Sequence, residues 1–419
     1  MRRAVITGMG VVAPGGVGVK PFWEQITSGR SATRPVTLFD ASAYRSRIAG
    51  EVDFDPVEAG LGHREAAELD RMVQFALAAL AEAQAGSGLD TERLDPARVG
   101  VALGTAVGAT MGLESQYAAV SRHGRDWLTD HELAAPNLFD FFVPSSLARE
   151  VAWAAKAEGP AAVVSTGCTS GLDAVGHALD LIRDGSADVM ITGASDAPLS
   201  PITYACFDAL RATSPDNHDP AGACRPFDRT RNGFALGEGA AVFVLEELEH
   251  ARRRGAHIHA ELAGFATRAN AYHMTGLRPD GAEMAEAIRV ALRQARLAPE
   301  DIDYVNAHGS GTRQNDLHET AAFKRALGPA AYDIPVSSIK SMIGHALGSV
   351  GSIEIAACAL AVEHGVVPPT ANLHEPDPEC DLDYVPLVAR ELRVDAALTV
   401  GSGFGGFQSA AVLHRLEDR

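Results

Sequence analysis

The sequence predicts an α/β fold built from two similar halves. Over 419 residues, apolar segments typical of buried strands alternate with amphipathic segments typical of helices. The pattern of residues 1–250 is repeated, in architecture though not residue by residue, in residues 251–419. No Pro/Ser-rich linker or low-complexity tract separates these halves, so we expect one body with mainly parallel sheets.

The first half opens with an expected strand at 2–7. Residues 8–13, GMGVVA, imitate a dinucleotide-binding fingerprint, but Pro14 breaks the helix that such a site requires. We therefore interpret 8–13 as a Gly-rich turn. An apolar stripe predicts a helix over 63–86, and a buried strand is expected at 99–104.

A strand, a tight turn and a helix are predicted around Cys168. The run AAVV at 161–164 precedes the turn, and LDAVGHALDLIRDG at 172–185 follows it. A thiol at a helix N-terminus lies beside free N–H groups and the positive end of the helix dipole, which favour the thiolate and can hold an oxyanion. Cys168 is the candidate nucleophile for acyl transfer; a small buried hydrophobe is the alternative.

The remainder of the first half holds strands and long irregular segments. Strands are expected at 187–193 and 240–245, and the loop-rich segment 212–239 suggests an elaboration near the site. Region 110–150 is irregular and could line a pocket, form a subunit contact or pack in the core. Its aromatic residues include Trp127, Phe139, Phe141 and Phe142.

The second half repeats these elements. The expected elements are a strand at 260–266, a helix at 283–297, a strand at 302–307, a helix after His345 and strands around 400–414. In duplicated halves, the helix after His345 corresponds to the helix after Cys168. We therefore expect the N-termini of these two helices to share a cleft.

Two histidines and a lysine lie where strands give way to loops. His308 lies in AHGSGT, and Lys340 and His345 lie in SSIKSMIGH. Singly, each histidine would more often be solvated or held in the core. Beside an activated cysteine, two imidazole N–H donors could stabilise the enolate of a malonyl thioester. Lys340 could orient one imidazole or form an ordinary surface ion pair.

Two further segments carry open alternatives. The run Gly401–Gly406 has four glycines around Phe404, which suits a mobile gate with an exposed N–H or a tight turn with a core phenylalanine. The segment Asp316–Glu319 resembles a helix capping box with Asp316 as the cap. That structural role for Glu319 stands beside a catalytic one.

The bulk composition excludes several classes of function. A net charge of −18 argues against general binding to nucleic acids or anionic membranes. The five cysteines have neither CxxC pairs nor metal-ligand spacing, so we expect no metal site and free thiols in the cytoplasm. The N-terminus lacks a signal-peptide core, and no uninterrupted apolar stretch could span a bilayer. Iodoacetamide should label Cys168 before the other four.

Four motifs together resemble the β-ketoacyl-acyl-carrier-protein synthases of the thiolase superfamily. They are STGCTSG around Cys168, AHGSGT around His308, SSIKSMIGH and GSGFGG around Phe404, in the order that the family has them. NAYHMTGL at 270–277, AHGSGTRQNDLHETAAFKRALG at 307–328 and HGVVPPTANL at 364–373 are similar to the catalytic ketosynthase subunit of bacterial type II aromatic polyketide synthases. The resemblance covers essentially the whole chain.

The resemblance implies a thiolase fold with five layers, α-β-α-β-α. It also implies decarboxylative Claisen condensation of malonyl units with an acyl chain on Cys168. It further implies that His308 and His345 promote malonyl decarboxylation, with Lys340 supporting His308. The N–H groups of Cys168 and Phe404 would form an oxyanion hole, and Glu319 would belong to a supporting polar network. Ser310 and Thr312 would contact the phosphopantetheine arm, and Arg211 would help to dock the acyl carrier protein.

The resemblance also implies partners and alternatives. Substrates would arrive on the phosphopantetheine arm of the acyl carrier protein, with no cofactor held by the chain itself. The partner would be a chain length factor, a homologous subunit that typically has glutamine in place of the active cysteine. A chain length factor is therefore the non-enzyme alternative, which Cys168 disfavours. A fatty-acid elongating ketosynthase is the alternative enzyme, since it shares the Cys-His-His set.

Overall fold

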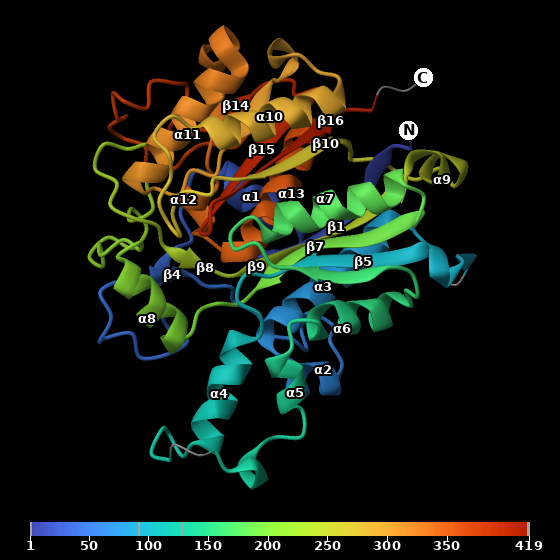
Figure 1. Ribbon diagram of the computed structural model, residues 1–419, viewed down its shortest axis with the longest axis vertical. Coiled ribbons are helices and arrows are strands. Elements are labelled where there is room, and N and C mark those ends of the chain that lie inside the picture. The colour runs from blue at the N-terminus through green and yellow to red at the C-terminus, as the bar shows by residue number, and fades with distance from the viewer. Residues whose placement is uncertain (1, 91–92, 127–128, 417–419) are drawn as a thin grey trace.

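The computed structural model describes residues 2–90, 93–126 and 129–416, so Trp127 lies outside the described residues (Figure 1). A single large sheet runs through the molecule. Its strand order is β12 (Val336–Ser337), β11 (Tyr304–Asn306), β15 (Ala396–Gly403), β16 (Phe407–His414), β10 (Ala260–Ala269), β1 (Ala4–Ala13), β9 (Gly239–Glu247), β7 (Val189–Asp196), β5 (Val99–Gly104) and β6 (Ala161–Val164), with β2 (Gly16–Val17) paired to β1.

The sheet order displays the duplication. Outward from the central β1–β10 pair, β1-β9-β7-β5-β6 matches β10-β16-β15-β11-β12. In both series the first two pairs are antiparallel and the last two are parallel. The expected repeat is confirmed, but the expectation of mainly parallel sheets is wrong. Only strands joined by helical crossovers run parallel, whereas β9 and β16 reverse direction after β7 and β15.

Helices complete five layers, as the thiolase resemblance implied. In the middle, α7 (Ser170–Arg183) packs against α13 (Val350–His364), and each also covers strands of the sheet. The outer layers are formed by α3 (Arg71–Ser87) with α6 (Ser146–Ala155) and by α10 (Ala282–Ala295) with α11 (Arg313–Leu327) (Figure 1). The smaller elements are α1 (Val19–Thr27), α8 (Pro201–Leu210), α9 (Leu248–Arg253), α12 (Lys340–Ile343), the sheet of β3 (Arg34–Pro35), β4 (Ile48–Gly50) and β8 (Leu236–Gly237), and the pair β13 (Val366–Val367) and β14 (Arg390–Glu391).

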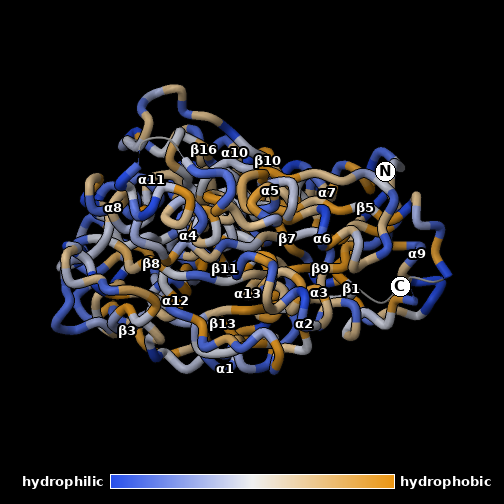
Figure 2. The backbone as a smooth tube through the Cα atoms, turned by 90° about the horizontal axis from the view of Figure 1, so that it is seen from below, coloured by the Kyte–Doolittle hydropathy of each residue, from blue (hydrophilic) through white to orange (hydrophobic). Residues whose placement is uncertain are grey.

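The middle layer is strongly apolar. Its helices α7 and α13 supply many fully buried residues of one hydrophobic core, and Figure 2 shows hydrophobic segments gathered inside the molecule. Within the described residues, one helical stretch, Leu347–His364, is long and apolar enough to cross a membrane. Since 89% of that stretch is buried inside the protein, its composition is that of a core helix.

Gly8 and Gly10 lie inside β1, so the predicted Gly-rich turn is wrong. The reason is packing rather than chain reversal. A Cβ atom on Gly8 would lie 2.1 Å from the carbonyl oxygen of Ala83, and one on Gly10 would lie 1.9 Å from that of Ala79. Both carbonyls belong to α3, so the two glycines let that helix lie directly on the strand.

We expect Gly10→Ala to destabilise the fold by about 3 kcal/mol, because the new methyl group must displace the backbone of α3. Gly86 in the same helix is the matched control, since its Cβ would meet nothing within 4 Å. Gly86→Ala should raise the free energy of unfolding by about 0.5–1 kcal/mol. Urea unfolding followed by circular dichroism measures both changes, and equal stability of the two variants would contradict the packing argument.

The helix predicted over 63–86 is two helices, α2 (His63–Glu68) and α3. Leu69 is extended, with ψ 146°, and breaks the helix. Asp70 then caps α3 by accepting a hydrogen bond from the Met72 N–H at 2.9 Å. Its other oxygen accepts from the Gly112 N–H at 2.8 Å, so the break also anchors the next segment.

That segment, 110–150, is more helical than expected. It holds α4 (Thr110–Val120), α5 (Leu138–Phe142) and the first half of α6, and α4 and α5 extend from the body of the molecule (Figure 1). Phe141 packs against the core, but the side chains of Phe139 and Phe142 are 67% and 69% exposed. Core packing is therefore wrong for Phe139 and Phe142.

Candidate active site

Hydrogen bonds from the first turn of α7 hold the turn at Cys168. It joins β6 to α7, as predicted, with Gly167 at φ +63°. The Ser170 hydroxyl accepts from the Thr166 N–H at 3.0 Å and donates to the Gly167 carbonyl at 2.6 Å. Asp173, one turn into α7, accepts hydrogen bonds from the hydroxyls of Thr166 and Thr169. The tip of the turn therefore has one fixed conformation.

Cys168 lies at a cavity of about 230 Å³. The structure brings most of the predicted site residues to its wall. These are Cys168, Arg211, His308, Ser310, Thr312, His345 and Phe404. Lys340 and Glu319 do not line the cavity; both are buried behind it. Residues from both halves thus meet at one site.

The two histidine rings lie edge to face, with centroids 5.2 Å apart. The Leu347 N–H donates to Nδ1 of His345 at 3.2 Å, which leaves the proton of the neutral ring on Nε2. Leu347 adopts φ +47°, a left-handed conformation, in making this contact. Burial, together with the charge of Lys340, holds the pKa of both His308 and His345 well below the usual value. Both rings are therefore neutral near pH 7 and able to donate an N–H.

Lys340 supports His308 through the backbone. Its Nζ donates to the His308 carbonyl oxygen at 2.5 Å and forms an ion pair with Glu354, and both charged side chains are fully buried. The alternative of a surface ion pair is therefore wrong, and the contact is made with the backbone rather than with the imidazole. Burial raises the pKa of Glu354 to about 7 although Lys340 lies beside it.

Glu319 fixes the same loop. It accepts from the N–H groups of His308 at 2.5 Å and Gly309 at 2.8 Å, and burial raises its pKa to about 8. The capping box is wrong, because α11 begins at Arg313, before Asp316. Asp316 instead accepts from the Phe227 N–H at 2.9 Å, since its side chain faces the neighbouring loop.

Phe404 lies at the turn of the β15–β16 hairpin, beside the cysteine. Hydrogen bonding by its backbone N–H and by that of Cys168 lowers the pKa of the thiol. A Cβ atom on Gly403 would lie 3.0 Å from the Thr166 carbonyl oxygen, so glycine permits this close approach. The Phe404 ring is 38% exposed and lies 6.4 Å from the Phe207 ring. The core-phenylalanine alternative is therefore wrong.

The thiol of Cys168 is not poised as a resting thiolate. Burial raises its pKa to about 11, and the charge of Asp196 adds to this, against the lowering by Lys340 and the two N–H groups. The expectation that the helix N-terminus favours the thiolate is therefore wrong for the resting site, because desolvation outweighs it. The expected order of alkylation also changes, since Cys206 is exposed and Cys168 is half-buried.

We expect iodoacetamide to label Cys206 before Cys168 at pH 7, and the rate at Cys168 to rise about tenfold per pH unit up to pH 10. The thiolate is the reactive form, and its fraction grows in that proportion below the pKa. Peptide mass spectrometry of time points gives both rates, and Cys206→Ser removes the competing thiol. A Cys168 rate that levels off near pH 7 would contradict the raised pKa.

The predicted binding residues line the same cavity. The hydroxyls of Ser310 and Thr312 are 2.9 Å apart. Arg211 is exposed and ends α8 in a left-handed conformation, with φ +52°. Phe207, on α8, and Phe234, in the loop-rich segment, also line the cavity, and the motifs alone did not reveal them.

The sequence motifs also did not indicate Asp196, whose charge raises the pKa of the Cys168 thiol. It accepts from the Thr105 hydroxyl at 2.6 Å and the Ala106 N–H at 2.8 Å, and burial raises its pKa to about 6. Its signal in the sequence is a carboxylate that directly ends a buried strand, VMITGASD.

Comparison with known proteins identifies the family to which the chain belongs. Residues 1–251 match the N-terminal domain of β-ketoacyl synthases and residues 259–374 match the C-terminal domain. The chain is 68% identical, over 99% of its length and 97% of the relative's, to the tetracenomycin polyketide synthase ketoacyl synthase alpha subunit of Streptomyces glaucescens. The chain belongs to the β-ketoacyl synthase family. Within that family it is a condensing acyltransferase of the type II polyketide synthase branch, as the resemblance implied.

Two solved structures share the fold over nearly the whole chain. One is a type II polyketide synthase acyl-carrier protein in complex with its ketosynthase bound to the hexaketide, with TM-score 0.92, 40% identity and coverage of 99% of this chain and 100% of that one. The other is the ishigamide ketosynthase/chain length factor, with TM-score 0.91, 35% identity and coverage of 99% and 100%.

Proposed function

We propose that this chain condenses malonyl units with an acyl chain on Cys168 to build a poly-β-ketone. The observation that carries the proposal is the meeting of one cysteine and two neutral imidazoles at one cavity. A cysteine can hold the acyl group as a thioester, and two N–H donors can stabilise an enolate oxygen.

In the first step, the Cys168 sulfur attacks the thioester carbonyl of an acyl group on the acyl carrier protein. The oxyanion accepts hydrogen bonds from the N–H groups of Cys168 and Phe404. The carbon–sulfur bond to the carrier then breaks, and the proton that Cys168 loses ends on the departing thiol. Because the pKa of Cys168 is raised to about 11, this proton must leave as the attack proceeds.

In the second step, a malonyl thioester loses CO₂. The electron pair of the broken carbon–carbon bond passes to the thioester, whose enolate oxygen accepts hydrogen bonds from His308 and His345. Lys340 and Glu319 hold the His308 loop in place through its backbone. The enolate carbon then attacks the acyl carbonyl on Cys168, and the carbon–sulfur bond breaks. A β-ketoacyl thioester remains on the carrier, and the Cys168 thiolate that leaves takes up one proton from water to restore the thiol.

We further propose that Ser310 and Thr312 contact the phosphopantetheine arm and that no cofactor is held by the chain. The carrier protein and a chain length factor would be its partners, in the cytoplasm. The two solved structures support these partners, since their descriptions name a carrier protein and a chain length factor.

Reconstitution with the carrier protein, the chain length factor and malonyl units tests the reaction. We expect mass spectrometry to find an unreduced poly-β-ketone. Saturated acyl chains, formed only when reductases are added, would instead identify the fatty-acid alternative.

We expect Arg211→Glu to raise KM for the acyl carrier protein about tenfold or more with little change in kcat. Arg211 is an exposed cation that lines the cavity, and reversing its charge would repel an acidic carrier protein. Arg225→Glu is the control for the change of charge, because Arg225 is paired with Asp216 and does not line the cavity. It should change KM for the carrier protein much less. Equal KM values for Arg211→Glu and the wild type would contradict the docking role.

A further inference from the structure

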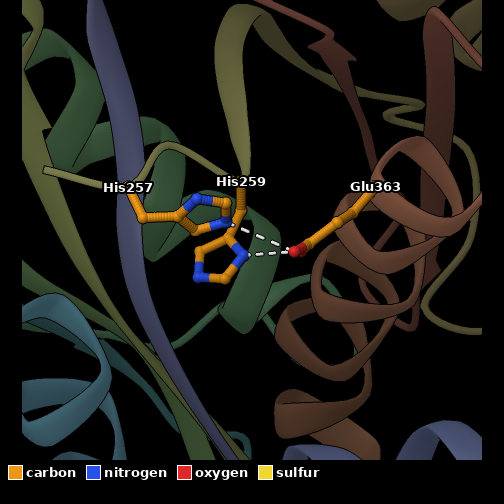
Figure 3. A group of neighbouring side chains, drawn as sticks. All are labelled: His257, His259 and Glu363. Atoms are coloured by element: carbon orange, nitrogen blue, oxygen red, sulfur yellow. Dashed lines mark hydrogen bonds and ion pairs between the residues drawn. The ribbon is translucent and has the colours of Figure 1, made fainter.

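Three side chains that take no part in the proposed reaction meet at the far end of the molecule. His257 and His259 lie between α9 and β10, where the chain passes from one half to the other, and Glu363 lies in the last turn of α13. His257 Nε2 lies 3.2 Å from one Glu363 oxygen, and His259 Nδ1 lies 2.7 Å from the other. Figure 3 shows both rings turned toward the carboxylate, with ring centroids 4.6 Å apart.

The arrangement suits a metal ion. One ligand atom from each residue lies within 4.8 Å of the other two. Tetrahedral zinc with bonds of about 2.1 Å places its ligands about 3.4 Å apart, so small side-chain rotations would complete the geometry. Two imidazoles and one carboxylate form a common zinc donor set that leaves a fourth position for water.

Two of the three ligand residues, His259 and Glu363, are held in place by the fold, and the side chain of His257 is free to rotate. The His259 backbone N–H donates to the Ile6 carbonyl oxygen at 2.9 Å, which ties this residue to β1. Glu363 belongs to the last turn of the buried core helix α13. The His257 side chain is 61% exposed, so it can rotate onto an ion that enters from solvent.

We propose that His257, His259 and Glu363 form a binding site for Zn²⁺. The bound ion links the segment between the two halves to the helix of the middle layer. It therefore stabilises the fold without entering the condensation reaction. The spacing of the cysteines could not indicate this site, because its ligands are two histidines and a glutamate that follows them by 106 and 104 residues in the sequence.

Zinc titration of the untagged, EDTA-treated full chain tests the site. We expect one Zn²⁺ per chain and a rise in Tm with zinc concentration. Glu363→Gln keeps the shape of the side chain but loses its charge, and His259→Ala removes a ligand. Each should weaken zinc binding about tenfold or more. His364→Ala is the matched control, since it removes the neighbouring imidazole on the same helix, which packs on Trp23.

Cobalt distinguishes this site from the catalytic one. Co²⁺ at His257, His259 and Glu363 should give visible d–d bands without thiolate charge-transfer absorption, whereas Co²⁺ at Cys168 would show that absorption. Zinc binding that is unchanged in both Glu363→Gln and His259→Ala would overturn the proposal. A wild-type Tm that does not respond to zinc, or a cobalt spectrum dominated by thiolate absorption, would also overturn it.

Discussion

Cys168→Ala is expected to abolish acyl loading and condensation while malonyl decarboxylation remains measurable. Condensation should fall at least about 10³-fold, because alanine cannot hold the acyl group as a thioester. Decarboxylation should survive, because His308 and His345 donate from other segments of the cavity wall. Radiolabelled acyl transfer and CO₂ release from malonyl carrier protein measure the two activities separately.

Cys206→Ala is the control for this experiment, since it removes an exposed thiol that lies outside the cavity wall. It should retain both activities. Equal loss of loading and decarboxylation in Cys168→Ala would contradict the assignment of separate roles to the sulfur and the imidazoles.

His345→Ala is expected to lower decarboxylation about 10²- to 10³-fold and acyl loading much less. That range is the usual effect of removing one preorganised hydrogen-bond donor from a developing oxyanion. His345 qualifies as a donor because the Leu347 N–H occupies Nδ1 and leaves Nε2–H free. Single-turnover CO₂ release, compared with the rate of Cys168 acylation, separates the two effects.

His345→Gln tests whether the donor itself matters. Its amide nitrogen can reach the position of Nε2, so part of the decarboxylation rate should return. A variant in which acyl loading falls while decarboxylation survives would overturn the role of His345.

The local sequence pattern was sufficient to predict the elements that carry the nucleophile. The strand, turn and helix around Cys168 follow from AAVV, the glycines and the amphipathic run that follows, and the structure has all three. The duplicated order was also predictable, because buried strands and helices recur in the same sequence in both halves. The strand, turn and helix depend on residues that are close in the sequence, and the duplicated order follows because such local elements recur in both halves.

Features set by distant contacts were not predictable. Gly8 and Gly10 suggest a turn unless one knows that α3 packs on them. The pKa of Cys168 depends on how deeply the folded protein buries the sulfur, which no motif reports. Asp316 looks like a helix cap until the loop of Phe227 is seen against it. In each case a contact between distant segments overrides the local pattern.

The central place of β1 in the sheet has a consequence for synthesis of the chain on the ribosome. Its two neighbours, β9 and β10, begin at Gly239 and Ala260, far behind it in the order of translation. Only Val12 and Ala13 can pair early, with β2. At ordinary rates of translation, the rest of this strand of ten buried residues waits on the order of ten seconds to a minute before either edge can be paired. A strand that is synthesised well before β9 and β10 is thus paired late along most of its length, and a chaperone would have most to protect there.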